Sequence, residues 1–148
     1  MLDDLRGMFI LLLGALIGIL GSIIIWHKQN REERRRNRAE LVLRTIDLTY
    51  STGTHTRCLI YSKNAGLHGV LHLPENPVDK IMAIVLIHFP NARQHVQTLH
   101  KQQQELFGHS SDPSESGSMK IIGENMVATM NDLVRCIHNI AEQEKLNI

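Results

Sequence analysis

The segment Met8–Trp26, MFILLLGALIGILGSIIIW, constrains the fold more than any other part of the chain because it carries no charged side chain. As a helix, its roughly 19 residues are about 28 Å long, close to the ~30 Å thickness of a bilayer's hydrocarbon core. Its Leu, Ile and Phe side chains favour insertion. We therefore predict an N-terminal part, residues 1–27, that forms one transmembrane helix, and a larger part, residues 28–148, outside the bilayer.

The residues that flank this segment indicate how it is used. A cleaved signal peptide would need a basic start and a small-x-small cleavage site, but the chain begins MLDDLRG and leaves the segment through IIIWHK, which favours a retained anchor. Arg6 is the only basic residue that precedes the segment. The basic cluster follows it and consists of Lys28, Arg31, Arg34, Arg35, Arg36 and Arg38. By the positive-inside rule we expect a single-pass protein of the cytoplasmic (inner) membrane, with its N-terminus outside and residues 28–148 in the cytoplasm.

The basic cluster itself has two interpretations. It is the topology signal expected of any span with this orientation, and we favour that interpretation. Alternatively, a cluster of this size beside a span binds anionic lipid headgroups. The formal net charge of the whole chain is only +1. Since the chain is nearly neutral and its dense group of basic residues sits against the membrane, we expect no nucleic-acid partner.

Small residues recur at every fourth position inside the span. Gly14, Gly18 and Ser22 therefore fall on one face of a helix. Small residues at this spacing allow two helix backbones to approach closely in lipid, although glycine is also common in transmembrane helices generally. The spacing predicts that the span associates with a second copy or with a partner membrane protein.

After the span, apolar residues continue at helical spacing. The positions are Ala39, Val42, Leu43, Ile46 and Tyr50, which predict a basic juxtamembrane helix over 28–50. Residues 51–73 remain open between more helix and a β-hairpin that turns at Asn64–Gly66, because Leu67, Gly69, Leu71 and Leu73 alternate. We favour helix, since an isolated two-stranded hairpin is marginal in water.

The next helix has a clear beginning. Asn76 supplies a capping side chain, Pro77 a proline at the first helical position, and Asp79 an acid in the first turn. A stripe then runs at steps of three and four through Val78, Met82, Val85, Phe89, Ala92, Val96, Leu99 and Leu106, with Gln103 in the one missing place. Because this register persists across Pro90, we predict one helix over 77–107, kinked at Phe89 and Pro90.

The apolar core of that helix, Ile81–Phe89, is too short for a second crossing, which needs about 20 residues, although a buried strand remains an alternative. Residues 108–117 predict a surface loop, and residues 118–145 a C-terminal helix. The expected buried stripe of the last helix is Met119, Ile122, Met126, Met130, Leu133, Ile137 and Ile140. We predict an all-α protein in which an antiparallel hairpin and the juxtamembrane helix form a small three- or four-helix bundle.

The layout of one N-terminal span, a basic amphipathic helix and the later segment DKIMAIVLIHFPNARQHVQTL resembles that of small bacterial membrane-anchored proteins. Their second soluble helix carries an aromatic–Phe–Pro element, which Phe89 and Pro90 match here, with His88 in the place of the aromatic residue. The resemblance covers the layout of most of the chain. It implies a helical fold and a membrane location, and no reaction.

The chain offers few groups with catalytic spacing. His68 and His72 would share a face as helix or strand, which is how a two-ligand metal site begins, but no third ligand has motif spacing. No HExxH, glycine-rich phosphate loop or nucleophile elbow occurs. We expect no enzymatic activity, cofactor, metal or small-molecule substrate, and predict a membrane-anchored interaction or accessory protein. The alternatives are a holin- or toxin-like membrane-perturbing protein, motivated by Ile81–Phe89, and a metal-binding protein built on His68 and His72.

Overall fold

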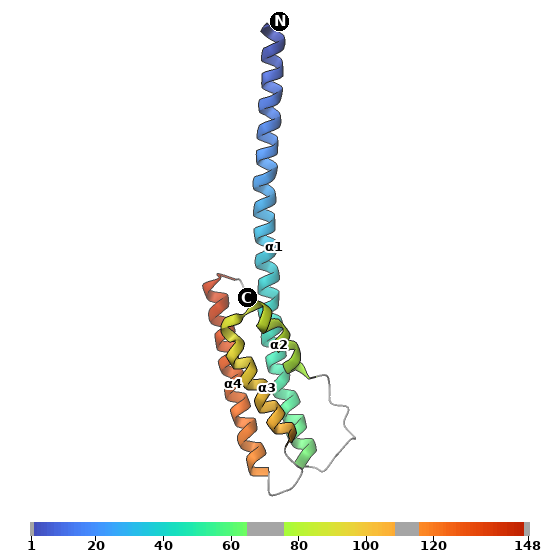
Figure 1. Ribbon diagram of the computed structural model, residues 1–148, viewed down its shortest axis with the longest axis vertical. Coiled ribbons are helices and arrows are strands. Elements are labelled where there is room, and N and C mark those ends of the chain that lie inside the picture. The colour runs from blue at the N-terminus through green and yellow to red at the C-terminus, as the bar shows by residue number, and fades with distance from the viewer. Residues whose placement is uncertain (1, 65–75, 109–115, 147–148) are drawn as a thin grey trace. The chain divides into compact units, whose positions relative to one another are not determined.

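The computed structural model describes residues 2–64, 76–108 and 116–146, and in these ranges the chain is helical without strands. Figure 1 shows the helices α1 (Leu2–Asn64), α2 (Pro77–His88), α3 (Arg93–Gly108) and α4 (Ser116–Gln143), with a 3-10 turn, η1 (Pro90–Ala92), between α2 and α3. The chain divides into two units, residues 1–38 and 39–148, and α1 contributes to both. The prediction of an all-α fold is confirmed.

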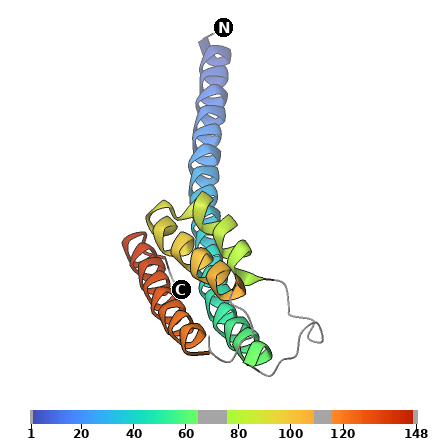
Figure 2. The same cartoon turned by 60° about the horizontal axis from the view of Figure 1, so that its bottom comes forward.

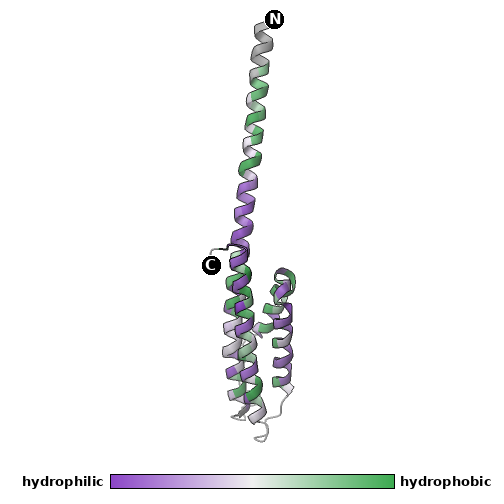
Figure 3. Cartoon of the chain, turned by 90° about the vertical axis from the view of Figure 1, so that its left-hand side faces the viewer, coloured by the Kyte–Doolittle hydropathy of each residue, from purple (hydrophilic) through white to green (hydrophobic). Residues whose placement is uncertain are grey.

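The first unit is a single helical segment of α1. Its large apolar side chains from Phe9 to Trp26 are exposed, between 45% at Leu13 and 75% at Leu11. Figure 3 shows this apolar stretch followed by a hydrophilic one. Among the described residues, α1 is the one helix long and apolar enough to cross a membrane. Exposed side chains of this kind are stable in a hydrocarbon environment, in agreement with the predicted span.

The second unit is a four-helix bundle in which successive helices run antiparallel. Asn76 and Asp79, at the start of α2, meet Gln103 and His100 near the end of α3, so these helices are antiparallel. Cys136 on α4 approaches Asn91 before the start of α3, which gives the same relation for α3 and α4. Figure 2 shows α2 and α3 folded back on each other next to α4.

Two contacts fix the ends of the helices within the bundle. The Asn76 side chain accepts a hydrogen bond from the Val78 N–H at 3.1 Å, which confirms the predicted N-cap of α2. At the C-terminal end of α1, the Lys63 ammonium donates hydrogen bonds to the carbonyl oxygens of Leu106 and Phe107, each at 2.9 Å. These carbonyls lie in the last turn of α3, where a cation also interacts favourably with the helix dipole. Gly108 ends α3, as predicted.

The prediction of one kinked helix over 77–107 is wrong. α2 ends at His88, and Phe89 adopts φ −133° and ψ 65°, outside the helical region. The ring of Pro90 disfavours the α conformation at the preceding residue and removes a donor, so the chain reverses instead of bending. The apolar stripe keeps its spacing across Pro90 because α2 and α3 each bury one face in the same core. Phe89 and Ala92, at its apex, are fully buried.

Most of the predicted stripes are buried. In α2 and α3 the stripe is correct except that Ile81 takes the buried place assigned to Met82, which is only half-buried. Gln103 occupies its expected place with 2% exposure. All seven residues of the α4 stripe belong to the core or pack against it. These residues form one continuous apolar core between α2, α3 and α4.

The juxtamembrane stripe was predicted only in part. Val42 is buried and Ile46 half-buried, but Leu43 and Tyr50 are 53% and 65% exposed. The buried face of α1 is instead formed largely by polar residues: Thr45, Thr49, Thr52, His55 and Thr56, between Val42 and Leu59. The preferred helical interpretation of residues 51–73 is confirmed as far as Asn64. Residues 65–73, with the predicted alternation of leucines, lie outside the described residues.

Candidate functional site

The predicted association residues lie on α1 in the first unit. Cβ atoms added at Gly14 and Gly18 would meet nothing within 4 Å, so the helix surface beside them is open. The Ser22 hydroxyl donates to the Gly18 carbonyl oxygen at 2.9 Å. Because this bond satisfies the hydroxyl within the helix, Ser22 presents a small surface to lipid or to another helix. Gly18 and Ser22 line a shallow depression together with Ala15, Ile19, Ile23 and Trp26.

The basic cluster also lies in the first unit, on α1. Lys28, Arg31, Arg34, Arg35 and Arg36 are exposed, and Arg38 is half-buried. Exposed cations in this position are available to lipid headgroups and equally serve as the topology signal.

The predicted kink residues have a structural role at the apex of the α2–α3 hairpin. The Phe89 side chain is fully buried, whereas Pro90 is exposed. The apolar stretch before them also has a place in the bundle, since Ile81 and Val85 are in the core. Ile87 is the exception, at 74% exposure.

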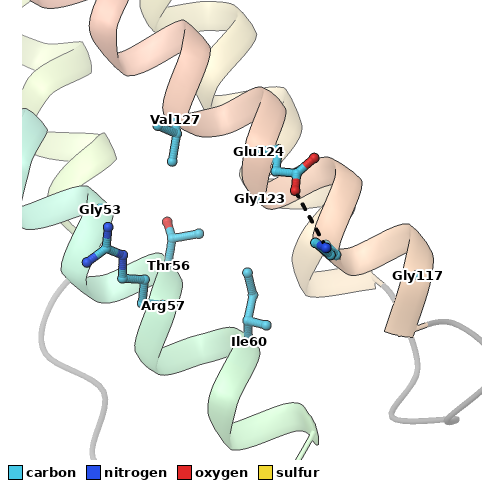
Figure 4. A pocket seen from close by; sticks show the side chains of 9 residues that line it. Gly53, Thr56, Arg57, Ile60, Gly117, Gly123, Glu124 and Val127 are labelled. Carbon is cyan, nitrogen blue, oxygen red and sulfur yellow. Dashed lines mark ion pairs between the residues drawn. The ribbon is translucent and has the colours of Figure 1, made fainter.

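A groove that the sequence did not predict runs between α1 and α4 in the second unit. We call it the α1–α4 groove. It consists of a hollow of about 540 Å³ and a second of about 380 Å³, which share Gly53, Arg57 and Val127. Figure 4 shows the larger hollow, with Thr56 and Ile60 on α1 facing α4. Both volumes are within the range of about 300–1,000 Å³ that is usual for small-molecule sites.

Glycines on both helices contribute to the lining of the groove. Gly53 lies on α1, and Gly117 and Gly123 lie on α4. A Cβ at Gly53 would be 3.7 Å from Met130 Cε, and one at Gly123 would be 2.9 Å from Ile60 Cδ1. The Ile60 side chain therefore rests on the backbone of α4 and closes the floor of the groove at this point.

The threonines beside the groove differ in how their hydroxyls are satisfied. Thr45, Thr49 and Thr52 each donate to the carbonyl four residues earlier, at 2.7–2.9 Å. Such bonds allow a threonine to pack in a core as a small β-branched side chain. The Thr56 hydroxyl has no hydrogen-bond partner among the described residues, although Thr56 is only 4% exposed. An unsatisfied buried hydroxyl is unfavourable, which makes Thr56 the exception on this face.

The charges at the groove are unequal. Lys120 Nζ lies 4.0 Å from Glu124 Oε1, and both side chains are well exposed. Arg57 lines both hollows and forms no ion pair with the described residues. The groove therefore combines an apolar floor with one guanidinium whose charge is not balanced locally. An arrangement of this kind can hold an apolar ligand with an anionic group.

The titratable residues His55 and Cys136 do not line the α1–α4 groove. His55 is 4% exposed, and neither of its ring nitrogens has a hydrogen-bond partner in the part of the chain that the structure describes. Burial lowers the pKa of His55. Burial raises the pKa of the Cys136 thiol. Within the described ranges no group of three or more His, Cys, Asp or Glu side chains could hold a metal ion. The predicted metal residues His68 and His72 lie outside the described residues.

The sequence did contain one signal for this site. Thr45, Thr49, Thr52 and Thr56 follow each other at steps of four, three and four, which is the spacing of one helix face. This stripe is polar, so a pattern of apolar residues alone does not reveal it. Comparisons of the chain with protein-family models, with curated proteins and with solved structures find no match.

Proposed function

We propose that this protein is a single-span membrane-anchored interaction protein that associates through the small-residue face of its span. The observation that carries the proposal is the open face of α1 at Gly14, Gly18 and Ser22, on which the one polar side chain is satisfied by its own helix. Since lipid removes the hydrophobic drive between helices, close backbone approach is a main source of association there. The helical bundle is the part held at the membrane surface.

The basic cluster supports the proposed orientation, with the bundle in the cytoplasm. Cys58 offers a direct measurement because it is exposed in the bundle and free. A membrane-impermeant maleimide should label Cys58 only after the cells are permeabilised. Labelling of intact cells would reverse the orientation and leave association through the span unaffected.

The association itself is tested with the double variant Gly14→Leu/Gly18→Leu. A Cβ at either position meets nothing within 4 Å, so the added side chains should act mainly on a neighbouring helix. The matched control is Leu16→Phe/Leu20→Phe, which adds bulk to the opposite face of the helix. The measurement is energy transfer between labelled copies of the full chain as the lipid-to-protein ratio rises.

We expect the glycine variant to weaken association by at least about tenfold, equivalent to ~1.4 kcal/mol, and the control to leave it unchanged. If the wild-type chain transfers no energy to a second copy, its native complex should contain a foreign membrane subunit that the glycine variant loses. Equal association of the wild type and both variants would refute the span as the site of interaction.

A further inference from the structure

The second half of α1, residues 39–64, contributes little to the apolar core of the bundle. We call this segment the α1 arm. Of the fully buried apolar residues in the described part of the chain, only Val42 and Leu59 lie on the arm. The others lie on α2, α3 and α4 or in the turn between α2 and α3. The remaining apolar residues of the arm that pack against the core are only partly buried: Leu41, Ile46, Leu48 and Ile60. Since burial of apolar surface is the main source of stability, α2, α3 and α4 keep most of their core without the arm.

The polar side chains on the buried face of the arm have hydrogen bonds that do not depend on the other helices. The hydroxyls of Thr45, Thr49 and Thr52 donate to carbonyls of α1 itself, so they stay satisfied as long as α1 stays helical. His55 and Thr56 are each 4% exposed, and their ring nitrogens and hydroxyl have no partner among the described residues. Water can supply these partners once the arm leaves the bundle. Separation therefore costs no hydrogen bond at the three threonines and gains hydrogen bonds at the other two residues.

Unfilled space borders the arm on two sides. The α1–α4 groove lies on one side. On the other side, a hollow of about 390 Å³ is lined by Leu48, His55 and Cys58 of α1 and by Pro77 and Lys80 of α2. Side chains that line a hollow lack van der Waals partners in that direction, so they hold two helices together less strongly than close packing does.

Contacts at two glycines and at the end of α1 hold the arm in place. Ile60 packs against the α4 backbone, since its Cδ1 lies 2.9 Å from a Cβ placed at Gly123, and Met130 Cε lies 3.7 Å from a Cβ placed at Gly53. Lys63 donates to two carbonyls of α3, and one of these bonds is exposed to solvent, where water can replace it at little cost. The contacts at the glycines are therefore those that a single substitution disturbs most directly.

We propose that the α1 arm is a detachable element, which separates from the bundle as a unit while α2, α3 and α4 stay folded around their own core. The open state uncovers the surface of α4 around Gly123 and Met130, which the arm covers in the closed state, so the arm regulates access to this surface. A helix that leaves its bundle exposes its buried face to water, and threonines make this exposure less costly than apolar side chains would. The inference concerns the bundle and does not depend on association through the span.

The experiment measures thiol labelling of the full chain in lipid nanodiscs, with Cys58 and Cys136 both replaced by serine. Thr52→Cys reports on the arm, because Thr52 is fully buried on α1. Ala92→Cys is the matched reporter of the core, because Ala92 is equally buried in the turn between α2 and α3. A thiol reagent reaches either cysteine only when the surrounding structure opens. We expect Thr52→Cys to react at least about 100-fold faster, because separation of the arm requires less free energy than unfolding of the bundle.

Two variants change the closed state in opposite directions. Gly123→Leu should accelerate labelling of Thr52→Cys by at least about tenfold, because the added side chain displaces Ile60. Gly117→Leu is the matched control, since Gly117 is an exposed glycine of α4 at which a Cβ meets nothing within 4 Å, and it should have no effect. Thr56→Val should slow labelling of the arm by about fivefold, because it removes the hydroxyl without a partner. The core reporter should keep its rate in Gly123→Leu and Gly117→Leu.

Two results would overturn the proposal. Equal labelling rates of Thr52→Cys and Ala92→Cys would mean that the arm separates only when the whole bundle unfolds. Thr45→Cys, which is also fully buried but lies nearer the start of the arm, should react as fast as Thr52→Cys. A rate closer to that of the core reporter would mean that the end of α1 frays and that the arm does not move as a unit. Both comparisons use the chain without Gly123→Leu, so they remain decisive if that variant fails to fold.

Discussion

The Asn76 side chain joins the start of α2 to the end of α3 through one oxygen. Asn76 Oδ1 accepts from the Val78 N–H at 3.1 Å and from Gln103 Nε2 at 2.8 Å. Gln103 is only 2% exposed, so Asn76→Ala removes the cap and leaves a buried donor without a partner. Loss of the cap costs about 1 kcal/mol and an unsatisfied buried donor about 1–3 kcal/mol. We expect a total loss of about 2–4 kcal/mol.

Two further variants separate these contributions. Asn76→Ser keeps a capping oxygen but is too short to reach Gln103, so it should cost mainly the second part. Gln103→Leu removes the donor and supplies the apolar residue missing from the buried stripe. In that background Asn76→Ala should cost only the cap, about 1 kcal/mol. The difference between the two backgrounds is the coupling energy of the pair, which we expect to be about 1–3 kcal/mol.

Hydrogen exchange of the α2 and α3 amides, with the full chain in mild detergent, measures the effect locally. A loss of 2–4 kcal/mol corresponds to exchange that is roughly 30 to 1,000 times faster. Acceleration should extend to α3, because Gln103 belongs to it. If Asn76→Ala costs the same with Gln103 and with Leu at that position, the reasoning from the shared oxygen is refuted.

Three other predictions concern the polar face of α1 and the membrane. Thr56→Val should stabilise the bundle by about 1 kcal/mol in thermal unfolding, because the hydroxyl it removes has no partner, and a loss of stability would show that the hydroxyl is satisfied. Burial lowers the pKa of His55, so the unfolded state binds the proton more readily than the folded state. The stability contributed by neutral His55 should therefore be fully present above the unfolded-state pKa of about 6.5 and should be lost as the pH falls below that value. The variant His55→Leu should flatten this pH dependence of the stability. Cells that express the chain should retain a trapped dye, because Ile81 and Val85 lie in the bundle core, and dye leakage would favour the membrane-perturbing alternative.

Several elements followed from the sequence because a single strong local signal determined each of them. The long apolar helix follows from an uncharged apolar segment, the start of α2 from Asn76 and Pro77, and the end of α3 from Gly108. The α4 stripe was recognised because its apolar residues contact one side of the core throughout. In each case local preference and tertiary packing favour the same structure.

The reversal at Phe89 could not be derived from periodicity. A stripe with unbroken phase is compatible both with one kinked helix and with two antiparallel helices that each bury one face. The contacts of Asn76 with Gln103, 27 residues later, distinguish the two, and such a contact has no local signature. Pro90 was the useful signal, since it restricts the residue before it more strongly than it bends a helix.

The buried polar residues of α1, mainly Thr45, Thr49 and Thr52, suggest why the second half of this long helix differs from its apolar first half. Residues that pack in the bundle must bury a surface, yet a second long apolar stretch on α1 would compete with Met8–Trp26 for the bilayer. Thr45, Thr49 and Thr52 bury their side chains while each hydroxyl bonds its own helix, so the segment packs without becoming strongly apolar. Threonines and glycines also have small side chains, which leaves space beside α1. Two of the small polar residues on this face, Thr49 and Thr56, also line the α1–α4 groove.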